Sequence, residues 1–258
     1  MGGRGEVRIF DDPDGVTRAA AEEFAKRAEH AVARHDRFDV VLSGGTTPRS
    51  LYALLAAQSA GQRGRIPWGQ TRVFFGDERH VPPTHPDSNY RMAYETLLSH
   101  VPVPASHVFR IGGEEPHATV AAREYERRLT EAFGLPDGGI PRFDLVLLGL
   151  GADGHTASLF PGGGTLQGVK RLAAAPYVVH LGGYRVTLTL PVLNHAACVA
   201  FLVTGADKAV ALRDALQGPD GIAASPARLV QPAPGDLLWF VDRAAASQLR
   251  IENPPDPT

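Results

Sequence analysis

Three groups of residues in the 258-residue sequence have the types and spacing of a reactive site. In the first group, Asp153 and His155 stand two positions apart in a glycine-rich segment. A histidine exchanges protons near neutral pH, and a neighbouring carboxylate orients the ring and favours the imidazolium that forms after proton abstraction. The pair therefore predicts general-base chemistry by His155, with Asp153 orienting it. The alternative is a histidine that only closes the turn.

The second group follows an apolar run and opens a predicted helix. Its small residues let backbone N–H groups approach an anion, while hydroxyl groups and the helix dipole add further attraction. The lysine of the Walker phosphate loop is absent, and a purely steric turn is the alternative interpretation. We expect this group to bind phosphate, and it consists of Ser43, Gly44, Gly45, Thr46 and Thr47.

The third group is a charged segment after another apolar run. Arg79 suits a phosphate or an oxyanion, and we expect Asp77 to position it. Carboxylates and histidines lie nearby, but their spacing fits no zinc pattern and Arg79 would repel a cation, so we predict no metal site. A solvated, salt-bridged loop is the alternative. Lys208, one of three lysines, follows a later apolar run and is either a phosphate contact or an exposed helix residue.

Residues 149–154, Gly-Leu-Gly-Ala-Asp-Gly, match the dinucleotide-binding fingerprint letter for letter. That motif requires an acidic residue about 20 positions later to bind the ribose. No Asp or Glu occurs between Asp153 and Asp207. The sequence therefore argues against NAD, and we expect no cofactor.

Continuous apolar runs indicate the fold class. Four of them, each ending at a glycine-containing segment, occupy residues 38–42, 72–75, 143–148 and 199–203. Such runs are typical of parallel strands covered on both faces, and helical spacing fills the intervals between them. We predict an α/β fold with a mostly parallel central sheet and helices on both faces, a Rossmann-like three-layer sandwich. A smaller edge region would contain the alternating strand at residues 185–190. Ligands of such sheets bind beyond the carboxyl ends of the strands.

Composition excludes several classes of partner. With 26 basic and 28 acidic side chains, the formal charge of −2 gives no global attraction to nucleic acid or an anionic membrane. No apolar stretch reaches the length of a membrane span or a signal peptide. Cys198 is the only cysteine and lies in an apolar run, which fits a buried residue and a reducing compartment. We expect one cytoplasmic domain over residues 1–258, with a disordered tail at about 253–258, as a monomer or weak homodimer.

Taken in order, three motifs resemble the 6-phosphogluconolactonase family. They are residues 43–48 (Ser-Gly-Gly-Thr-Thr-Pro), 76–82 (Gly-Asp-Glu-Arg-His-Val-Pro) with 87–90 (Asp-Ser-Asn-Tyr), and 149–161 (Gly-Leu-Gly-Ala-Asp-Gly-His-Thr-Ala-Ser-Leu-Phe-Pro). The resemblance covers nearly the whole chain. The family's first loop usually has serine where Thr46 stands, and threonine keeps the hydroxyl.

This resemblance implies hydrolysis of 6-phospho-D-glucono-1,5-lactone to 6-phospho-D-gluconate, the second step of the oxidative pentose phosphate pathway, without a required cofactor. In that reaction His155 would act as general base toward the attacking water. Arg79 and backbone N–H groups would hold the phosphate or the developing oxyanion, and Arg185 and Lys208 would join residues 43–47 in binding phosphate.

Two alternative functions are to be weighed against the sequence. The related glucosamine-6-phosphate deaminase/isomerase family shares the fold and the Asp-Gly-His turn, but it carries a catalytic glutamate shortly after that histidine. Residues 156–161 contain no carboxylate here. A non-catalytic sugar-phosphate-sensing domain would usually accompany a DNA-binding segment, and no basic helix-turn-helix stretch is visible.

Overall fold

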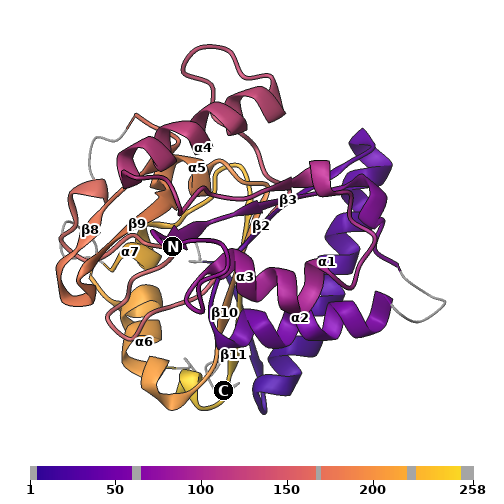
Figure 1. The fold of residues 1–258 in the computed structure, drawn as a ribbon. Helices are drawn as coiled ribbons and strands as arrows, with labels where there is room; N and C mark the ends of the chain where they lie inside the picture. Colours follow the sequence, from indigo (N-terminus) through magenta and orange to yellow (C-terminus); the bar gives the residue numbers. More distant parts are fainter. Residues whose placement is uncertain (1–4, 60–64, 167–169, 220–224, 251–258) are drawn as a thin grey trace, which may run out of the picture.

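The computed structural model describes residues 5–59, 65–166, 170–219 and 225–250 (Figure 1). Its central sheet has seven strands, and every neighbouring pair is parallel. In spatial order the strands are β1 (Glu6–Phe10), β11 (Asp236–Asp242), β10 (Cys198–Val203), β6 (Leu145–Leu148), β2 (Phe38–Leu42), β3 (Thr71–Phe75) and β5 (Val108–Phe109). The predicted disordered tail at 253–258 lies outside the described residues.

The four apolar runs of the sequence form the middle of this sheet. They become β2, β3, β6 and β10, and all residues of β2, β6 and β10 are buried. Both faces of these strands are covered, so their side chains are apolar in succession rather than alternately. The predicted α/β fold with a parallel central sheet is therefore confirmed.

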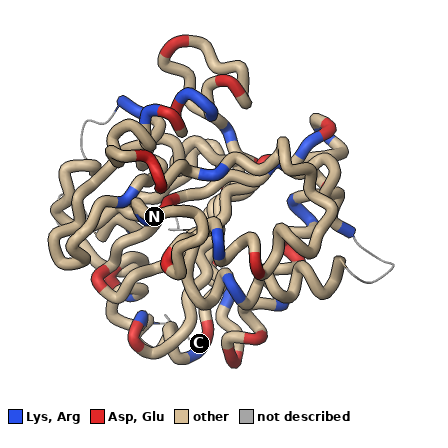
Figure 2. The backbone as a smooth tube through the Cα atoms, in the orientation of Figure 1, with Lys and Arg blue, Asp and Glu red and all other residues tan. Residues whose placement is uncertain are grey.

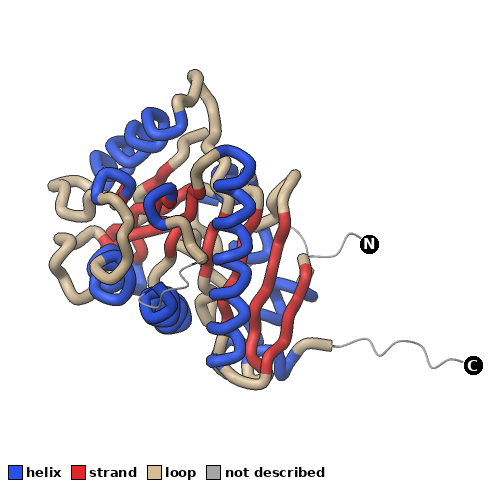
Figure 3. The backbone as a smooth tube through the Cα atoms, turned by 90° about the vertical axis from the view of Figure 1, so that its right-hand side faces the viewer, coloured by secondary structure: helices blue, strands red, loops and turns tan. Residues whose placement is uncertain are grey.

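Helices flank the sheet on both sides (Figure 3). They are α1 (Pro13–His35), α2 (Thr46–Ser59), α3 (Asn89–Ala93), α4 (Ala118–Phe133), α5 (Leu190–Asn194), α6 (Ala209–Gln217) and α7 (Pro226–Leu229). The π-helical segment η2 (Tyr94–Leu98) continues α3. Short 3-10 helices are η1 (Trp68–Gln70), η3 (Ala105–His107), η4 (Gly164–Leu166), η5 (Val179–Leu181), η6 (Ala206–Lys208) and η7 (Ala245–Gln248).

A smaller antiparallel sheet stands beside the central one. Its strands are β4 (Asp77–Arg79), β9 (Gly183–Leu188), β7 (Ala173–Ala174) and β8 (Tyr177–Val178). The predicted alternating strand at 185–190 is confirmed as β9, shifted by two residues. Gly76 joins the two sheets, because its N–H donates to Leu42 O at 2.9 Å and its carbonyl accepts from Leu188 N at 2.8 Å. The small sheet thus begins where β3 ends.

The burial of Cys198 and the distribution of charged residues both agree with what the composition predicts. Cys198 is fully buried in β10, and burial raises the pKa of its thiol to about 12. Figure 2 shows acidic and basic positions interspersed along the trace. Among the residues described here, no helix is long and apolar enough to cross a membrane.

Tyr125 of α4 provides a test of how the carboxyl end of β3 is held. Its buried hydroxyl accepts from Phe75 N at 3.0 Å and donates to Phe75 O at 2.9 Å. Because Tyr125→Phe leaves both backbone groups without this partner, we expect the free energy of unfolding to fall by about 1–3 kcal/mol in urea denaturation. The control is Tyr94→Phe, since Tyr94 is 49% exposed. Equal midpoints for the two variants would contradict this account.

Candidate active site

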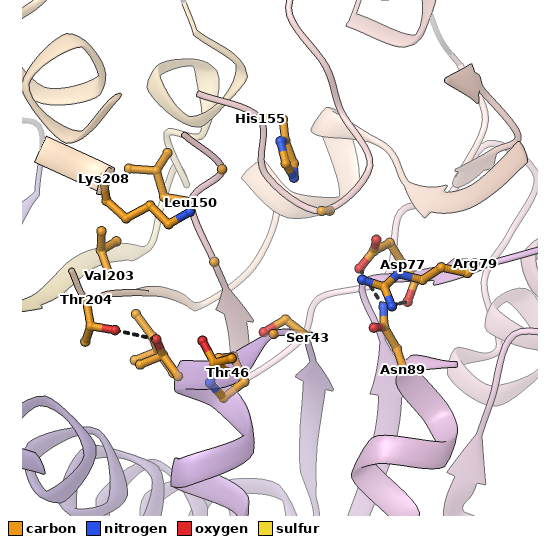
Figure 4. A pocket seen from close by; sticks show the side chains of 18 residues that line it. Ser43, Thr46, Asp77, Arg79, Asn89, Leu150, His155, Val203, Thr204 and Lys208 are labelled. Carbon is orange, nitrogen blue, oxygen red and sulfur yellow. Dashed lines mark hydrogen bonds between the residues drawn. The ribbon is translucent and has the colours of Figure 1, made fainter. Parts of the chain in front are cut away.

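The carboxyl-terminal ends of β2, β6 and β10, together with β4, enclose a cavity of about 250 Å³ (Figure 4). The predicted site residues that line it are Ser43, Gly44, Gly45, Thr46, Thr47, Asp77, Arg79, His155 and Lys208. In Figure 4 the side chains of His155, Lys208 and Asp77 surround the space above Ser43 and Thr46. One cavity therefore collects a histidine, two cationic side chains and a glycine-rich loop.

Tyr52 of α2 holds the 43–47 loop in place through two hydrogen bonds. The Tyr52 hydroxyl accepts from Ser43 N at 2.9 Å and donates to Ser43 O at 2.8 Å. The Ser43 side chain lines the cavity, and its buried Oγ has no hydrogen-bond partner among the described residues. The 14-residue helix α2 begins at Thr46, so its free N–H groups point toward the same space. A buried hydroxyl and a helix N-terminus together suit an anion.

Gly44 lies against the side chain of Asn89 at the start of α3. A Cβ at Gly44 would lie 1.9 Å from Asn89 Oδ1, so any other residue there would displace the Asn89 side chain. The Asn89 amide in turn donates to the Asp77 backbone carbonyl at 3.0 Å and to Asp77 Oδ1 at 3.2 Å. Asn89 lines the cavity and was not predicted as a site residue, although it lies in a motif that carries the family resemblance. Its buried position at the start of α3 is the feature that the sequence does not display.

Glu78 fixes the charged segment that carries Arg79. Its buried carboxylate accepts from Arg79 N, Ser88 Oγ, Asn89 N and Tyr90 N at 2.7 to 2.9 Å. Burial raises the pKa of Glu78, and these four donors oppose the rise. The carboxylate therefore fastens β4 to the start of α3.

Asp77 has different partners from those expected. Its Oδ2 accepts from Ser158 Oγ at 2.7 Å and its Oδ1 from Asn89, whereas the Arg79 guanidinium donates to the Asp87 backbone carbonyl. Arg79 is therefore held by the backbone carbonyl of Asp87 and not, as expected, by Asp77. Asp77 instead joins β4 to the segment that follows His155, because Ser158 lies there.

Asp153 and His155 form the predicted pair. His155 Nδ1 lies 2.5 Å from Asp153 Oδ1, and His155 N donates to the same oxygen at 3.2 Å. Burial raises the pKa of Asp153, but the hydrogen bonds from His155 outweigh it and leave the pKa below the ordinary value. An ionised Asp153 makes Nδ1 the protonated ring nitrogen, which leaves Nε2 free to accept a proton. His155 lines the cavity, and Asp153 lies behind it.

The two remaining cationic predictions have different outcomes. Lys208 lines the cavity beside Thr204 and is paired with Asp207 at 3.0 Å. Thr204 Oγ1 lies 2.7 Å from Thr47 Oγ1, which joins the end of β10 to the 43–47 loop. Arg185 is not among the lining residues of this cavity.

Arg185 lies next to Arg79, on the adjacent strand of the small sheet. The two residues are paired in the antiparallel register of β4 and β9. Burial lowers the pKa of Arg185, and the neighbouring charge of Arg79 lowers it further. Arg185 therefore adds positive charge beside Arg79 but does not form part of the cavity wall. Within the described part of the chain, no group of three or more His, Cys, Asp or Glu side chains could hold a metal ion.

A family model for glucosamine-6-phosphate isomerases/6-phosphogluconolactonase matches residues 11–239. The chain belongs to this family. It is 37% identical over 245 residues to a protein of Nostoc sp. named 6-phosphogluconolactonase. The aligned region covers 95% of this chain and 98% of that protein. It is 39% identical over 254 residues to the Rattus norvegicus protein of the same name, covering 96% and 95% respectively.

A solved structure gives the same assignment of fold. The 6-phosphogluconolactonase of Trypanosoma cruzi superposes with a TM-score of 0.84 at 27% identity, over 97% of this chain and 99% of that chain. The family resemblance predicted from the three motifs is therefore confirmed. Each of the three motifs contributes residues that line the cavity.

Gly151 lies against the Asp153–His155 pair, so a side chain at this position should disturb the pair. A Cβ at position 151 would lie 2.1 Å from His155 Nδ1 and 2.6 Å from Asp153 Oδ1. Gly151→Ala should therefore break the Nδ1–Oδ1 hydrogen bond, and the downfield proton resonance of Nδ1 should disappear from the NMR spectrum. Gly69→Ala is the control, because a Cβ there meets nothing within 4 Å. Retention of the resonance in Gly151→Ala would show that the pair does not depend on this close approach.

Proposed function

We propose that this protein hydrolyses 6-phospho-D-glucono-1,5-lactone to 6-phospho-D-gluconate, the second step of the oxidative pentose phosphate pathway. Relatives from Nostoc sp. and Rattus norvegicus that match nearly the whole chain carry the name of this activity. The observation that carries the proposal is that His155, with Asp153 behind it, lines the same cavity as the 43–47 loop and Lys208. A base and an anion-binding loop are the two components that this substrate requires.

The 43–47 loop and Lys208 are the phosphate-binding end of the cavity in this proposal. The buried Ser43 Oγ supplies a donor with no other partner among the described residues, and α2 directs its N-terminus to the same place. Lys208 adds a point charge from η6, the short helix that follows β10. Hydrogen bonds in which one partner is charged are shorter and about twice as strong as neutral ones, so this set favours a phosphate dianion.

His155 acts on the water in this mechanism. Nε2 takes a proton from a water molecule as the water oxygen attacks the lactone carbonyl carbon, and a tetrahedral oxyanion forms. When the bond between this carbon and the ring oxygen breaks, the imidazolium returns the proton to the departing oxygen. The ionised Asp153 stabilises the imidazolium between these two steps.

Arg79 is the cation placed to stabilise the developing negative charge. Its side chain lines the cavity, and Glu78 fixes its backbone. Fixed donors and charges that face a developing oxyanion lower the barrier because they need no reorganisation during the reaction. Hydrolysis of an ester in this way needs a water, a base and anion stabilisation, all of which the proposal assigns.

The residues after His155 favour hydrolysis over deamination. Residues 156–161 contain no carboxylate. The side chains of Thr156 and Ser158 are engaged with Gly149 O and Asp77 Oδ2. This segment therefore offers no second acid for ring opening of an amino sugar.

The direct test is an assay of acid release from freshly prepared 6-phosphogluconolactone, corrected for spontaneous ring opening. Purified protein should accelerate release well above the uncatalysed rate. Binding of the sugar phosphate without acceleration would instead indicate a sensing domain, and turnover of glucosamine 6-phosphate would indicate a deaminase.

His155→Ala should lower kcat in this assay by about 10²- to 10⁴-fold, the range of general acid–base catalysis. The melting temperature should stay near that of the wild type, because His155 lies at the cavity surface rather than in the core. His30→Ala, at an exposed position of α1, is the matched control. Wild-type turnover by His155→Ala would remove the imidazole from the reaction.

Lys208→Ala should chiefly raise KM, by about 10- to 100-fold, since a hydrogen bond to a charged group contributes roughly 1.5–3 kcal/mol. Arg79→Ala should chiefly lower kcat, by about 10²- to 10³-fold, because a donor to a developing oxyanion acts in the transition state. The measurement is steady-state kinetics with the phosphorylated lactone. Lys26→Ala, at an exposed position of α1, controls for the loss of a positive charge alone. An unchanged KM in Lys208→Ala would refute its role in phosphate binding, and an unchanged kcat in Arg79→Ala would refute its role in stabilising the oxyanion.

A further inference from the structure

Phe160 makes a contact with His155 that the mechanism above does not use. The two rings are stacked, with centroids 4.5 Å apart and planes inclined by 29°. Phe160 is half-buried and does not line the cavity of His155. It lines a separate groove of about 540 Å³, together with Asp153, Tyr177 and His180. The His180 ring meets Phe160 edge-on at 5.3 Å.

A tight turn holds Phe160 in this position. Thr156 and Leu159 exchange two backbone hydrogen bonds, and Ala157 between them has a φ of 47°, in the left-handed region. The Thr156 hydroxyl donates to Gly149 O at 2.8 Å. The buried Ser158 hydroxyl donates to Asp77 at 2.7 Å. Hydrogen bonds to Gly149, which follows β6, and to Asp77 of β4 therefore fix the turn that directs Phe160 back toward His155.

The hydrogen bond to Asp153 restrains the His155 ring at one atom, Nδ1. Hydrogen bonds tolerate a range of angles, so coupled changes of χ1 and χ2 can still tilt the plane of the ring. Gly151 borders the ring at its Nδ1 and Cε1 edge, where a Cβ would lie within 2.3 Å of both atoms. Stacking on Phe160 restrains this remaining tilt, because it covers one face of the ring.

We propose that Phe160 is a positioning residue for the reaction. Its ring sets the plane of the His155 imidazole, which lies at the cavity (Figure 4), so that Nε2 can reach the attacking water. This proposal rests on the proposed function of His155 as general base. Phe160 does not line the cavity, so we expect its effect on the rate of the chemical step rather than on binding of the phosphate.

The test compares Phe160→Leu with Phe160→Tyr. Leucine keeps an apolar side chain but removes the flat face, whereas tyrosine keeps the ring and can extend its hydroxyl into the 540 Å³ groove. Phe10→Leu is the matched control, because Phe10 is also half-buried and stacks on Phe240 at 6.3 Å, outside the site.

We expect Phe160→Leu to lower kcat by about 10- to 100-fold with KM unchanged, the scale of loss for a misplaced catalytic group. Phe160→Tyr should retain the wild-type kcat, because it keeps the aromatic ring. Phe10→Leu should also leave kcat at the wild-type value. Wild-type kcat in Phe160→Leu, or an equal loss in Phe160→Tyr, would overturn the proposal.

A second readout separates this proposal from the proposed function. The Nδ1 proton of His155 should give a sharp downfield NMR resonance in the wild type and in Phe160→Tyr, and exchange should broaden it in Phe160→Leu. This measurement needs no substrate. If the wild type does not hydrolyse the lactone, the proposed function fails, yet the resonance still decides whether Phe160 orients His155. A sharp resonance in Phe160→Leu would exclude the positioning role.

Discussion

Parallel pairing of the central strands is the constraint on which the rest of this structure depends. Because β2, β6 and β10 run in the same direction, their carboxyl ends reach the same edge of the sheet. Segments that are distant in the sequence therefore meet there, and Thr47 and Thr204, 157 positions apart, lie 2.7 Å from each other. The sheet fixes the place of the site, and the short segments after each strand supply its chemistry.

The features that could be predicted from the sequence are those that depend on neighbouring residues. Fully buried parallel strands have continuous apolar runs, so the strands at the centre of the sheet were recognisable. Asp153 and His155 are two positions apart, and their hydrogen bond needs only a local turn. The 43–47 loop is likewise a local pattern of small residues between a strand and a helix. These predictions agree with the structure because no distant contact is needed to form them.

The features that escaped prediction depend on contacts between distant segments. Asp77 was expected beside Arg79, but its carboxylate is held by Ser158, 81 positions later. Arg185 was expected among the phosphate contacts, yet the register of β4 and β9 sets it opposite Arg79, outside the cavity lining. Asn89 enters the site because Gly44 leaves room for its amide. Strand register and the close approach of side chains are properties of the assembled fold, and no local pattern encodes them.

The carboxylate of Asp77 on the wall of a largely cationic cavity has a consequence for turnover. If the cavity opens a phosphorylated lactone as proposed, the product gains a carboxylate and carries one more negative charge than the substrate. Lys208 and Arg79 alone would then retain the product more strongly than the substrate. Under that proposal, the Asp77 carboxylate in the same space would repel the newly formed carboxylate and so would oppose retention of the product.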